Sequence, residues 1–246
     1  MRIATYNIQH GISHKQRIVD GTDTLDMQLM IDTIRGLEPE ICGLNEVFGD
    51  GAYPLYFNQP KFIGDALGYE SVFAMAVDFE GDFTPPRKPY GNGLISKHPI
   101  KSEEIILIPK GNDDDPGYKE PRCILKTVID CDGRDLCYIV IHVGLTKQEK
   151  GFALKRLCKV LDETDMPTVL VGDFNITPED ELLAPVRERM FDTAELIKED
   201  LRSYPSDKPE IKIDYIFTRG LRVKSADIPQ ICAADHCPYI ADIEFE

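Results

Sequence analysis

Residues 168–175 read TVLVGDFN, an apolar run that ends in glycine, aspartate, phenylalanine and asparagine. Valine and threonine are common in strands, and the Gly-Asp pair is typical of the turn that ends a strand. Just before this run, four apolar residues recur at the spacing of one helix face and predict a helix near 147–162: Leu154, Leu157, Cys158 and Leu161. A helix that leads directly into a buried strand is typical of an α/β protein.

The same pattern of helix and then strand occurs once earlier, with a helix predicted near 24–37 and a strand at 40–46. A third helix is predicted to begin at Thr177-Pro178-Glu179-Asp180, with Thr177 as its N-cap. Apolar runs of strand length occupy residues 3–6, 41–44, 71–77, 93–96, 104–108, 123–129, 136–143, 168–171, 213–217 and 239–245. Residues 93–143 read as consecutive antiparallel strands. The whole pattern predicts a sandwich of two packed mixed β-sheets with helices on its faces, in one domain over residues 1–246.

The net charge of the chain argues against some classes of binding partner. It has 246 residues with 28 Lys and Arg against 43 Asp and Glu, a net charge of −15. Such acidity argues against a protein that grips nucleic acid without sequence preference or adsorbs to anionic membranes. No apolar stretch approaches the roughly 20 residues that span a bilayer. The N-terminal residues lack the pattern of a secretory signal, and the seven cysteines lack zinc-site spacing, so we expect a cytoplasmic protein with reduced thiols.

Four loops interrupt the strands, at 47–60, 78–91, 109–120 and 203–210. Basic residues lie in them, and so do several aromatic residues: Tyr53, Tyr56, Phe57, Phe79, Phe83, Tyr90 and Tyr118. Loops on a rigid scaffold often carry specificity, but aromatic residues also pin loops to the body of a protein. Both interpretations stay open at this point.

Polar side chains recur where the apolar runs end. These are Asn7, Glu46, His142, Asp173 with Asn175, and Asp235 with His236, while Asp214 lies between apolar neighbours. If the strand ends converge, carboxylate and amide oxygens form a cluster that suits Mg²⁺ or Mn²⁺. A divalent cation there would hold a phosphate and its attacking water. A buried carboxylate needs a partner, and His236 is the natural one for Asp214.

Six ordered motifs resemble the endonuclease/exonuclease/phosphatase superfamily of DNase I-like enzymes: TYN (5–7), LNEV (44–47), GNGLISKHPI (91–100), GDFN (172–175), IDYIF (213–217) and DH (235–236). The resemblance runs from residue 5 to residue 236 and implies a four-layer α/β sandwich. It also implies a metal-dependent phosphodiesterase or nuclease, with a phosphoester as its substrate.

The resemblance further implies a role for each matching residue. Glu46 is expected to ligate the metal, with Asn7 and Asp235 holding it or its waters. Asp173 is expected to orient or deprotonate the attacking water, and Asn175 to contact the phosphate. Asp214 is expected to pair with His236, which supports the phosphoryl oxygens, while His142 assists the leaving group.

Two positions depart from the usual motifs. Asn45 stands where glutamine is common before the metal-binding glutamate, and Ala234 stands where serine is common before the last Asp-His pair. Neither change removes a central group.

Three further residues are candidates for substrate binding. Lys119 and Arg122 are positioned to meet a phosphate, or else to form surface salt bridges. Asn92 either lines the pocket or builds its turn. His10, His14 and His98 are expected at the surface or in turns. The acidic charge favours a smaller phosphodiester, such as a lipid headgroup or a sugar or nucleotide diester, over DNA or RNA. A catalytically inactive phosphate-binding module is the third reading.

Overall fold

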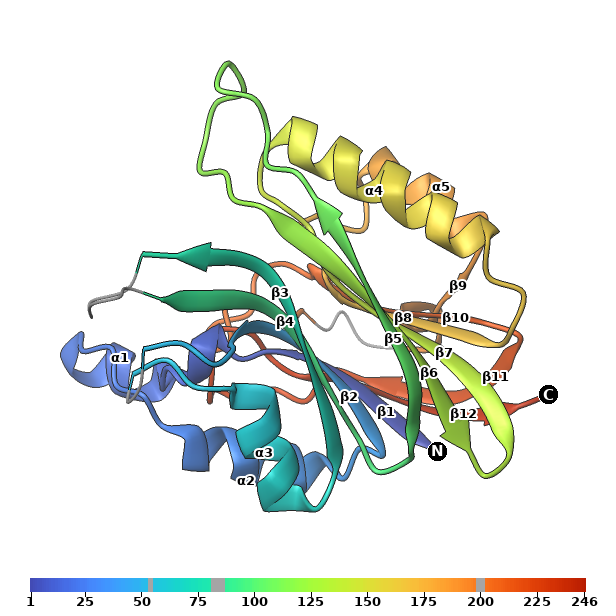
Figure 1. Cartoon of the computed structure of the whole chain (residues 1–246), viewed down its shortest axis with the longest axis horizontal. Coiled ribbons are helices and arrows are strands. Elements are labelled where there is room, and N and C mark those ends of the chain that lie inside the picture. Colours follow the sequence, from blue (N-terminus) through green and yellow to red (C-terminus); the bar gives the residue numbers. More distant parts are fainter. Residues whose placement is uncertain (53–54, 81–86, 198–201) are drawn as a thin grey trace.

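A computed structural model describes residues 1–52, 55–80, 87–197 and 202–246 (Figure 1). Two six-stranded sheets are formed within these ranges. The first sheet has the strand order β11 (Leu221–Asp227), β12 (Tyr239–Phe245), β1 (Arg2–Asn7), β2 (Ile41–Phe48), β4 (Lys88–Ser96) and β3 (Glu70–Phe79). The second has the order β5 (Ile100–Ile108), β6 (Arg122–Cys131), β7 (Arg134–His142), β8 (Thr168–Asp173), β10 (Asp214–Arg219) and β9 (Phe191–Asp192).

Both sheets are mixed and share one design. A parallel pair lies near the middle of each, β1 with β2 and β7 with β8, and the other neighbours are antiparallel. Parallel neighbours need a crossover, and helices supply it. The crossover helix of the first sheet is α2 (Met27–Leu37), and that of the second is α4 (Lys147–Asp162).

Three apolar layers hold the sandwich together. The inner layer lies between the sheets and joins residues such as Ile3 and Val171. On the outer face of the first sheet, α2 and α3 (Gln59–Leu67) form a second layer that includes Met30. On the outer face of the second, α4 and α5 (Ala184–Arg187) form a third that includes Leu157. Helix, sheet, sheet and helix thus form four layers, as the sequence predicted (Figure 1).

The predicted third helix begins later than expected. Thr177 is not an N-cap, because the turn that its carbonyl closes by accepting the amide of Asp180 at 3.1 Å does not continue into a helix. The Asp180 side chain instead caps a short 3-10 helix, Glu181–Leu183, by accepting the amide of Leu182 at 2.9 Å. The prediction at Thr177 was therefore wrong by one turn, since the aspartate is the better placed acceptor.

The chain also changes sheets inside residues 93–143. β4 belongs to the first sheet and β5 to the second, so only β5, β6 and β7 form the expected antiparallel run. The change occurs at residues 97–99, where the Ser96 hydroxyl accepts the amide of His98 at 3.0 Å. Pro99 follows directly and has no amide hydrogen for a sheet ladder.

Some elements carry no clear sequence signal. Helix α1 (His14–Asp20) buries none of its residues, so it has no apolar stripe to detect. In strand β11 only Leu221 is buried. Tyr53 and Phe83, named above among the loop aromatics, lie outside the described residues. Across the described chain, no helix is both long enough and apolar enough to cross a membrane.

Candidate active site

The register of the strands brings the predicted polar residues to one edge of each sheet. In the first sheet, Asn7 at the end of β1 is opposite Asn45 of β2. In the second, Asp173 at the end of β8 is opposite both His142 of β7 and Asp214 of β10. Parallel neighbours end at the same edge, so these side chains meet where the two sheets face each other.

Three irregularities of the backbone set the directions of side chains in the site. A β-bulge falls in β2 between Leu44 and Val47, and within it Glu46 takes a positive φ of 55°. Such bulges turn a side chain out of the regular alternation of a strand. After β8, Asn175 takes a φ of 50°, and its amide donates to Asp173 Oδ1 at 2.9 Å. Asp173 and Asn175 are thus brought together by a turn and not by continued strand geometry.

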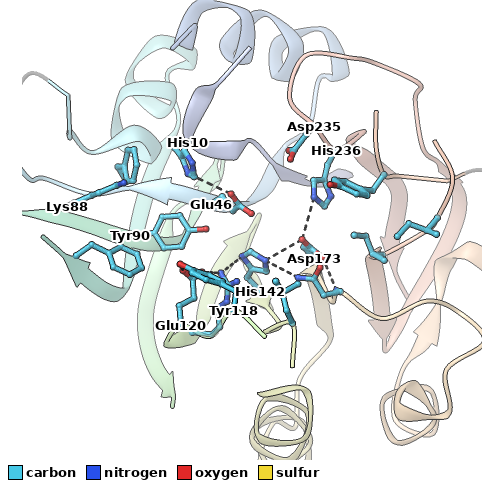
Figure 2. Close-up of a pocket in the computed structure, with 18 of the residues that line it drawn as sticks. His10, Glu46, Lys88, Tyr90, Tyr118, Glu120, His142, Asp173, Asp235 and His236 are labelled. Carbon is cyan, nitrogen blue, oxygen red and sulfur yellow. Dashed lines mark hydrogen bonds and ion pairs between the residues drawn. The ribbon is translucent and has the colours of Figure 1, made fainter. Parts of the chain in front are cut away.

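These residues line a cavity of about 550 Å³. Figure 2 shows its two sides, with Glu46 between them. One side carries the predicted catalytic groups His142, Asp173, Asn175 and His236, together with Asp235, which was predicted to hold the metal. The other side carries a ring-rich wall of His10, Phe48, Tyr90 and Tyr118, with Lys88 beside it. We call this second group the aromatic wall.

The Asp173 carboxylate is at the centre of the first side. Its Oδ2 accepts from Asn7 Nδ2 at 3.2 Å and lies 3.4 Å from His142 Nε2 and 3.6 Å from His236 Nε2. Burial alone raises the pKa of Asp173, but the two imidazoles and the Asn175 amide lower it below the ordinary range. The group is therefore a carboxylate at neutral pH, held where it can accept a hydrogen bond from water.

The buried His236 imidazole is paired as the sequence suggested. Its Nδ1 lies 2.8 Å from Asp214 Oδ2, which leaves Nε2 facing Asp173. Burial lowers the pKa of His236, but the Asp214 and Asp173 carboxylates raise it to about 10. The ring is therefore positively charged at neutral pH and directs an N–H toward the cavity.

Two of the residues predicted to hold a cation, Glu46 and Asp235, bring carboxylate oxygens to the cavity. Asp235 Oδ1 is buried and has no hydrogen-bond partner among the described residues, and burial raises the pKa of this carboxyl to about 6. Glu46 keeps one oxygen bonded to Asn7 Nδ2 at 3.1 Å, and its Oε2 lies 3.7 Å from His10 Nδ1. Two carboxylates that face one cavity supply the hard oxygen ligands that Mg²⁺ or Mn²⁺ prefers, while Asn7 turns its amide nitrogen toward Glu46. Asp173, Asp214 and His236 also have atoms within 4.8 Å of one another, close enough to share a metal ion. Asp214 and His236, however, form a hydrogen bond with each other.

The three residues predicted to bind substrate have different positions. Arg122 lines the cavity, where it forms a buried ion pair with Glu120. Asn92 lies behind the site with 1 % of its surface exposed, and its side chain donates to the Cys123 carbonyl at 2.8 Å. Lys119 is not among the residues that line the cavity, because its ammonium donates to the carbonyls of Asn112 and Asp115 in its own loop.

Asn45, the departure noted in the second motif, connects the sheets. Its side-chain amide donates to Asn92 Oδ1 at 2.8 Å and to the Ile141 carbonyl at 3.0 Å. Its side-chain oxygen accepts the Asp173 amide at 2.9 Å. The shorter side chain therefore positions Asp173 from behind the cavity.

His10 is a residue of the cavity that sequence reasoning missed. Expected at the surface or in a turn, it lines the pocket and stacks on Phe48 with a ring separation of 4.9 Å. His10 lies three residues after Asn7, just beyond the end of β1, and this short spacing is the sequence signal by which it would have been found. His14 and His98 lie elsewhere and pair with Asp207 and Glu40.

Comparisons with known proteins agree with this architecture. The model of the Endonuclease/Exonuclease/phosphatase family matches residues 4–236. A UPF0294 protein of Vibrio campbellii is 28 % identical over 157 residues, which are 61 % of this chain and 54 % of that protein. A second, from Vibrio vulnificus, is 33 % identical over 116 residues, 44 % of this chain and 39 % of its own length. The chain thus spans about half or less of these curated relatives.

Solved structures share the fold at low identity. An endonuclease/exonuclease/phosphatase from Beutenbergia cavernae has a TM-score of 0.77 and 22 % identity, covering 100 % of this chain and 71 % of its own. A mannosyl-6-phosphatase from Bacteroides thetaiotaomicron has a TM-score of 0.78 and 16 % identity, covering 100 % of both chains. The human Nocturnin catalytic domain has a TM-score of 0.69 and 18 % identity, covering 100 % of this chain and 94 % of its own. Because the family model spans nearly the whole chain, this protein belongs to the endonuclease/exonuclease/phosphatase family.

Proposed function

We propose that this protein hydrolyses a small phosphodiester with the help of Mg²⁺ or Mn²⁺. The observation that carries the proposal is the buried Asp173 carboxylate, placed between the Asn7 amide and two imidazoles in a cavity of about 550 Å³. That volume falls within the roughly 300–1,000 Å³ of small-ligand sites. Family membership supports the class of reaction, hydrolysis of a phosphoester.

Each residue of the site has a proposed task. Asp173 accepts a hydrogen bond from the attacking water and orients it toward phosphorus. His236, charged and held by Asp214, directs its Nε2–H at the phosphoryl oxygens and stabilises the charge that develops there. Asn175 contacts the phosphate, and His142 donates a hydrogen bond to the leaving oxygen. A cation held by Glu46, Asp235 and Asn7 would withdraw charge from the phosphoryl oxygens.

The lining of the cavity favours a small substrate over a long polyanion. Its charged residues include four carboxylates, Glu46, Glu120, Asp173 and Asp235, against three cations, Lys88, Arg122 and the protonated His236. Stable contact with a nucleic-acid backbone needs a run of cations that displaces counterions. The aromatic wall offers ring faces on which a sugar ring or a planar group can pack. The Bacteroides thetaiotaomicron neighbour is named a mannosyl-6-phosphatase.

Asp173→Asn tests the reaction. We expect this variant to stay folded and to lose about 10²–10⁴-fold in kcat, because the neutral amide lacks the negative charge and the second acceptor oxygen with which Asp173 orients the water. The measurement is hydrolysis of bis-p-nitrophenyl phosphate with Mg²⁺ or Mn²⁺. Asp162→Asn is the matched control, since Asp162 is an exposed residue that pairs with Arg189 at 2.7 Å. Near-normal turnover by Asp173→Asn refutes the assigned role.

A substrate comparison tests the proposed size of the substrate. Bis-p-nitrophenyl phosphate, sugar phosphomonoesters and nicking of supercoiled plasmid are assayed side by side over a range of salt. We expect turnover of the small diester with little dependence on salt. Efficient nicking that falls steeply with salt identifies a nuclease instead.

We also propose that residues 1–246 act as one domain in the cytoplasm. The layer between the sheets includes residues from Ile3 to Ile243, which supports one folding unit. The seven cysteines are all free thiols in the structure, which suits a compartment that keeps thiols reduced. To test the reduced state of the cysteines, the protein is purified and unfolded without reductant and its thiols are titrated. Fewer than seven reactive thiols would contradict the proposal.

A further inference from the structure

A buried arginine touches the outer nitrogen of a site histidine. Arg122 and His142 have side chains that are 7 % and 3 % exposed. The guanidinium NH1 of Arg122 lies 2.9 Å from His142 Nδ1, on the side of the ring that faces away from Asp173. Nothing in the family resemblance or in the proposed catalytic roles uses this contact.

The chemistry of the two groups decides which ring nitrogen carries the proton. A guanidinium has N–H donors and no acceptor, so a hydrogen bond at this distance requires an unprotonated Nδ1. The neutral ring then carries its hydrogen on Nε2. That atom faces Asp173 Oδ2 at 3.4 Å, and the carboxylate can accept from it.

One further contact competes with this arrangement. Asn175 Nδ2 lies 3.3 Å from His142 Nε2, and the same amide nitrogen donates to the Val143 carbonyl at 3.0 Å. Placing the proton on Nδ1 would satisfy Asn175 but would set two N–H groups against each other at the Arg122 contact. The arginine contact is shorter and charged, and a guanidinium has no acceptor face to turn toward the ring.

The surroundings hold Arg122 in place. Its NH1 pairs with the Glu120 carboxylate, and the hydroxyl of Tyr118 donates to that carboxylate at 2.8 Å. The backbone amide of Glu120 donates to Glu149 Oε1 at 3.1 Å. Glu149 belongs to the capping box at the start of α4, so the ion pair is fastened to a helix and not to a free loop.

We propose that Arg122 is a positioning residue that keeps His142 as the neutral Nε2–H tautomer. This assignment rests on the proposed function. The Nε2–H tautomer makes His142 a hydrogen-bond donor to the substrate. His236 then supplies the full positive charge on the other side of the phosphate. It also assigns Arg122 to the wall behind His142, in place of a direct contact with phosphate.

Nuclear magnetic resonance of ¹⁵N-histidine-labelled protein tests the tautomer without substrate. Spectra are taken at about pH 8, above the ordinary histidine pKa of about 6.5, and His142→Gln identifies the His142 signals. We expect a protonated Nε2 and an unprotonated Nδ1 in the wild type. In Arg122→Met we expect the proton to move wholly or partly to Nδ1, with a loss of about 10- to 100-fold in kcat and little change in KM.

Three further variants separate the positioning role of Arg122 from simple misfolding. Arg122→Met leaves the Glu120 carboxylate buried without its partner, which is destabilising. Glu120→Gln with Arg122→Met removes both charges and is expected to show the same shift of tautomer. Glu120→Gln alone keeps the arginine contact and is expected to keep the wild-type tautomer. Arg189→Met removes an arginine from an ion pair outside the cavity and is expected to change neither signal nor turnover.

Either of two results would overturn the proposal. One is a wild-type His142 with its proton on Nδ1, and the other is an unchanged tautomer once Arg122 is replaced. The proposed function fails separately, by the absence of hydrolysis of any phosphoester, because the tautomer is read in protein without substrate.

Discussion

At the residue scale, His236 lies between two carboxylates, and this position links the site to pH. Burial lowers the pKa of His236, and Asp214 and Asp173 raise it to about 10 in the folded protein. In the unfolded chain the pKa returns to about 6.5. A pKa that is higher in the folded state adds stability that is complete below the unfolded value and is lost as pH rises through the folded value.

We therefore expect the wild type to lose stability between about pH 6.5 and about pH 10, by a few kcal/mol, as His236 releases its proton. His236→Gln removes this part of the loss because it has no proton to release. Urea unfolding at steps of pH, without added metal, measures the difference between the two proteins. His98→Gln is the control, since His98 pairs with Glu40 outside the cavity. Parallel stability curves for wild type and His236→Gln would contradict the prediction.

At the element scale, strand β8 and helix α4 each contain a glycine, but only the strand depends on it. Gly172, in β8 just before Asp173, has a φ of 142°, and a Cβ there would lie 1.8 Å from the Ile141 carbonyl oxygen. Gly151, inside α4, would place a Cβ in open space. The first position requires glycine because of both conformation and contact, and the second does not.

We expect Gly172→Ala to lower the free energy of unfolding by more than about 2 kcal/mol, because the strand must shift away from β7. The shift also moves Asp173, so kcat should fall even in the fraction that folds. Gly151→Ala should raise stability by about 0.5–1 kcal/mol, since alanine favours a helix over glycine. Urea unfolding of both variants supplies the comparison, and equal stabilities would show that β8 tolerates a side chain at this point.

At the scale of the whole molecule, acidity and the site are connected. The chain carries a net charge of −15, and two of its carboxylates, Glu46 and Asp235, face the same cavity. Within the part of the chain that the structure describes, the buried Oδ1 of Asp235 has no hydrogen-bond partner. A cation that binds between them relieves their repulsion in the folded state only, and binding to the folded state alone stabilises it.

We expect Mg²⁺ or Mn²⁺ to raise the Tm of the wild type by several degrees, and Glu46→Gln to lose most of this shift. Differential scanning fluorimetry over a range of metal concentration measures both proteins. Asp113→Asn is the control, because Asp113 is an exposed acid in another loop, and it should keep the full shift. An equal shift in Glu46→Gln would place the cation elsewhere.

Much of the fold follows from the sequence alone, because the signals are local. Apolar runs of strand length mark the sheets, and apolar residues at helical spacing mark α2 and α4, since each element buries one face. Polar residues at the ends of those runs indicate where the sheets converge. Elements without a buried face, such as α1, leave no such pattern and were missed.

The details of the site depend on contacts between residues far apart in the chain. Asn7 meets Asp173 across 166 positions, and Arg122 meets His142 across 20, in geometries that no local pattern contains. The sequence by itself determined most of the strands, the family and the set of polar residues at the strand ends, but not strands β9 and β11. The tertiary structure alone decided that His10 lines the cavity, that Lys119 turns into its own loop and that Arg122 faces a histidine. The physical reason is that hydrogen bonding and burial are set by whichever groups packing brings together, and packing is a property of the whole chain.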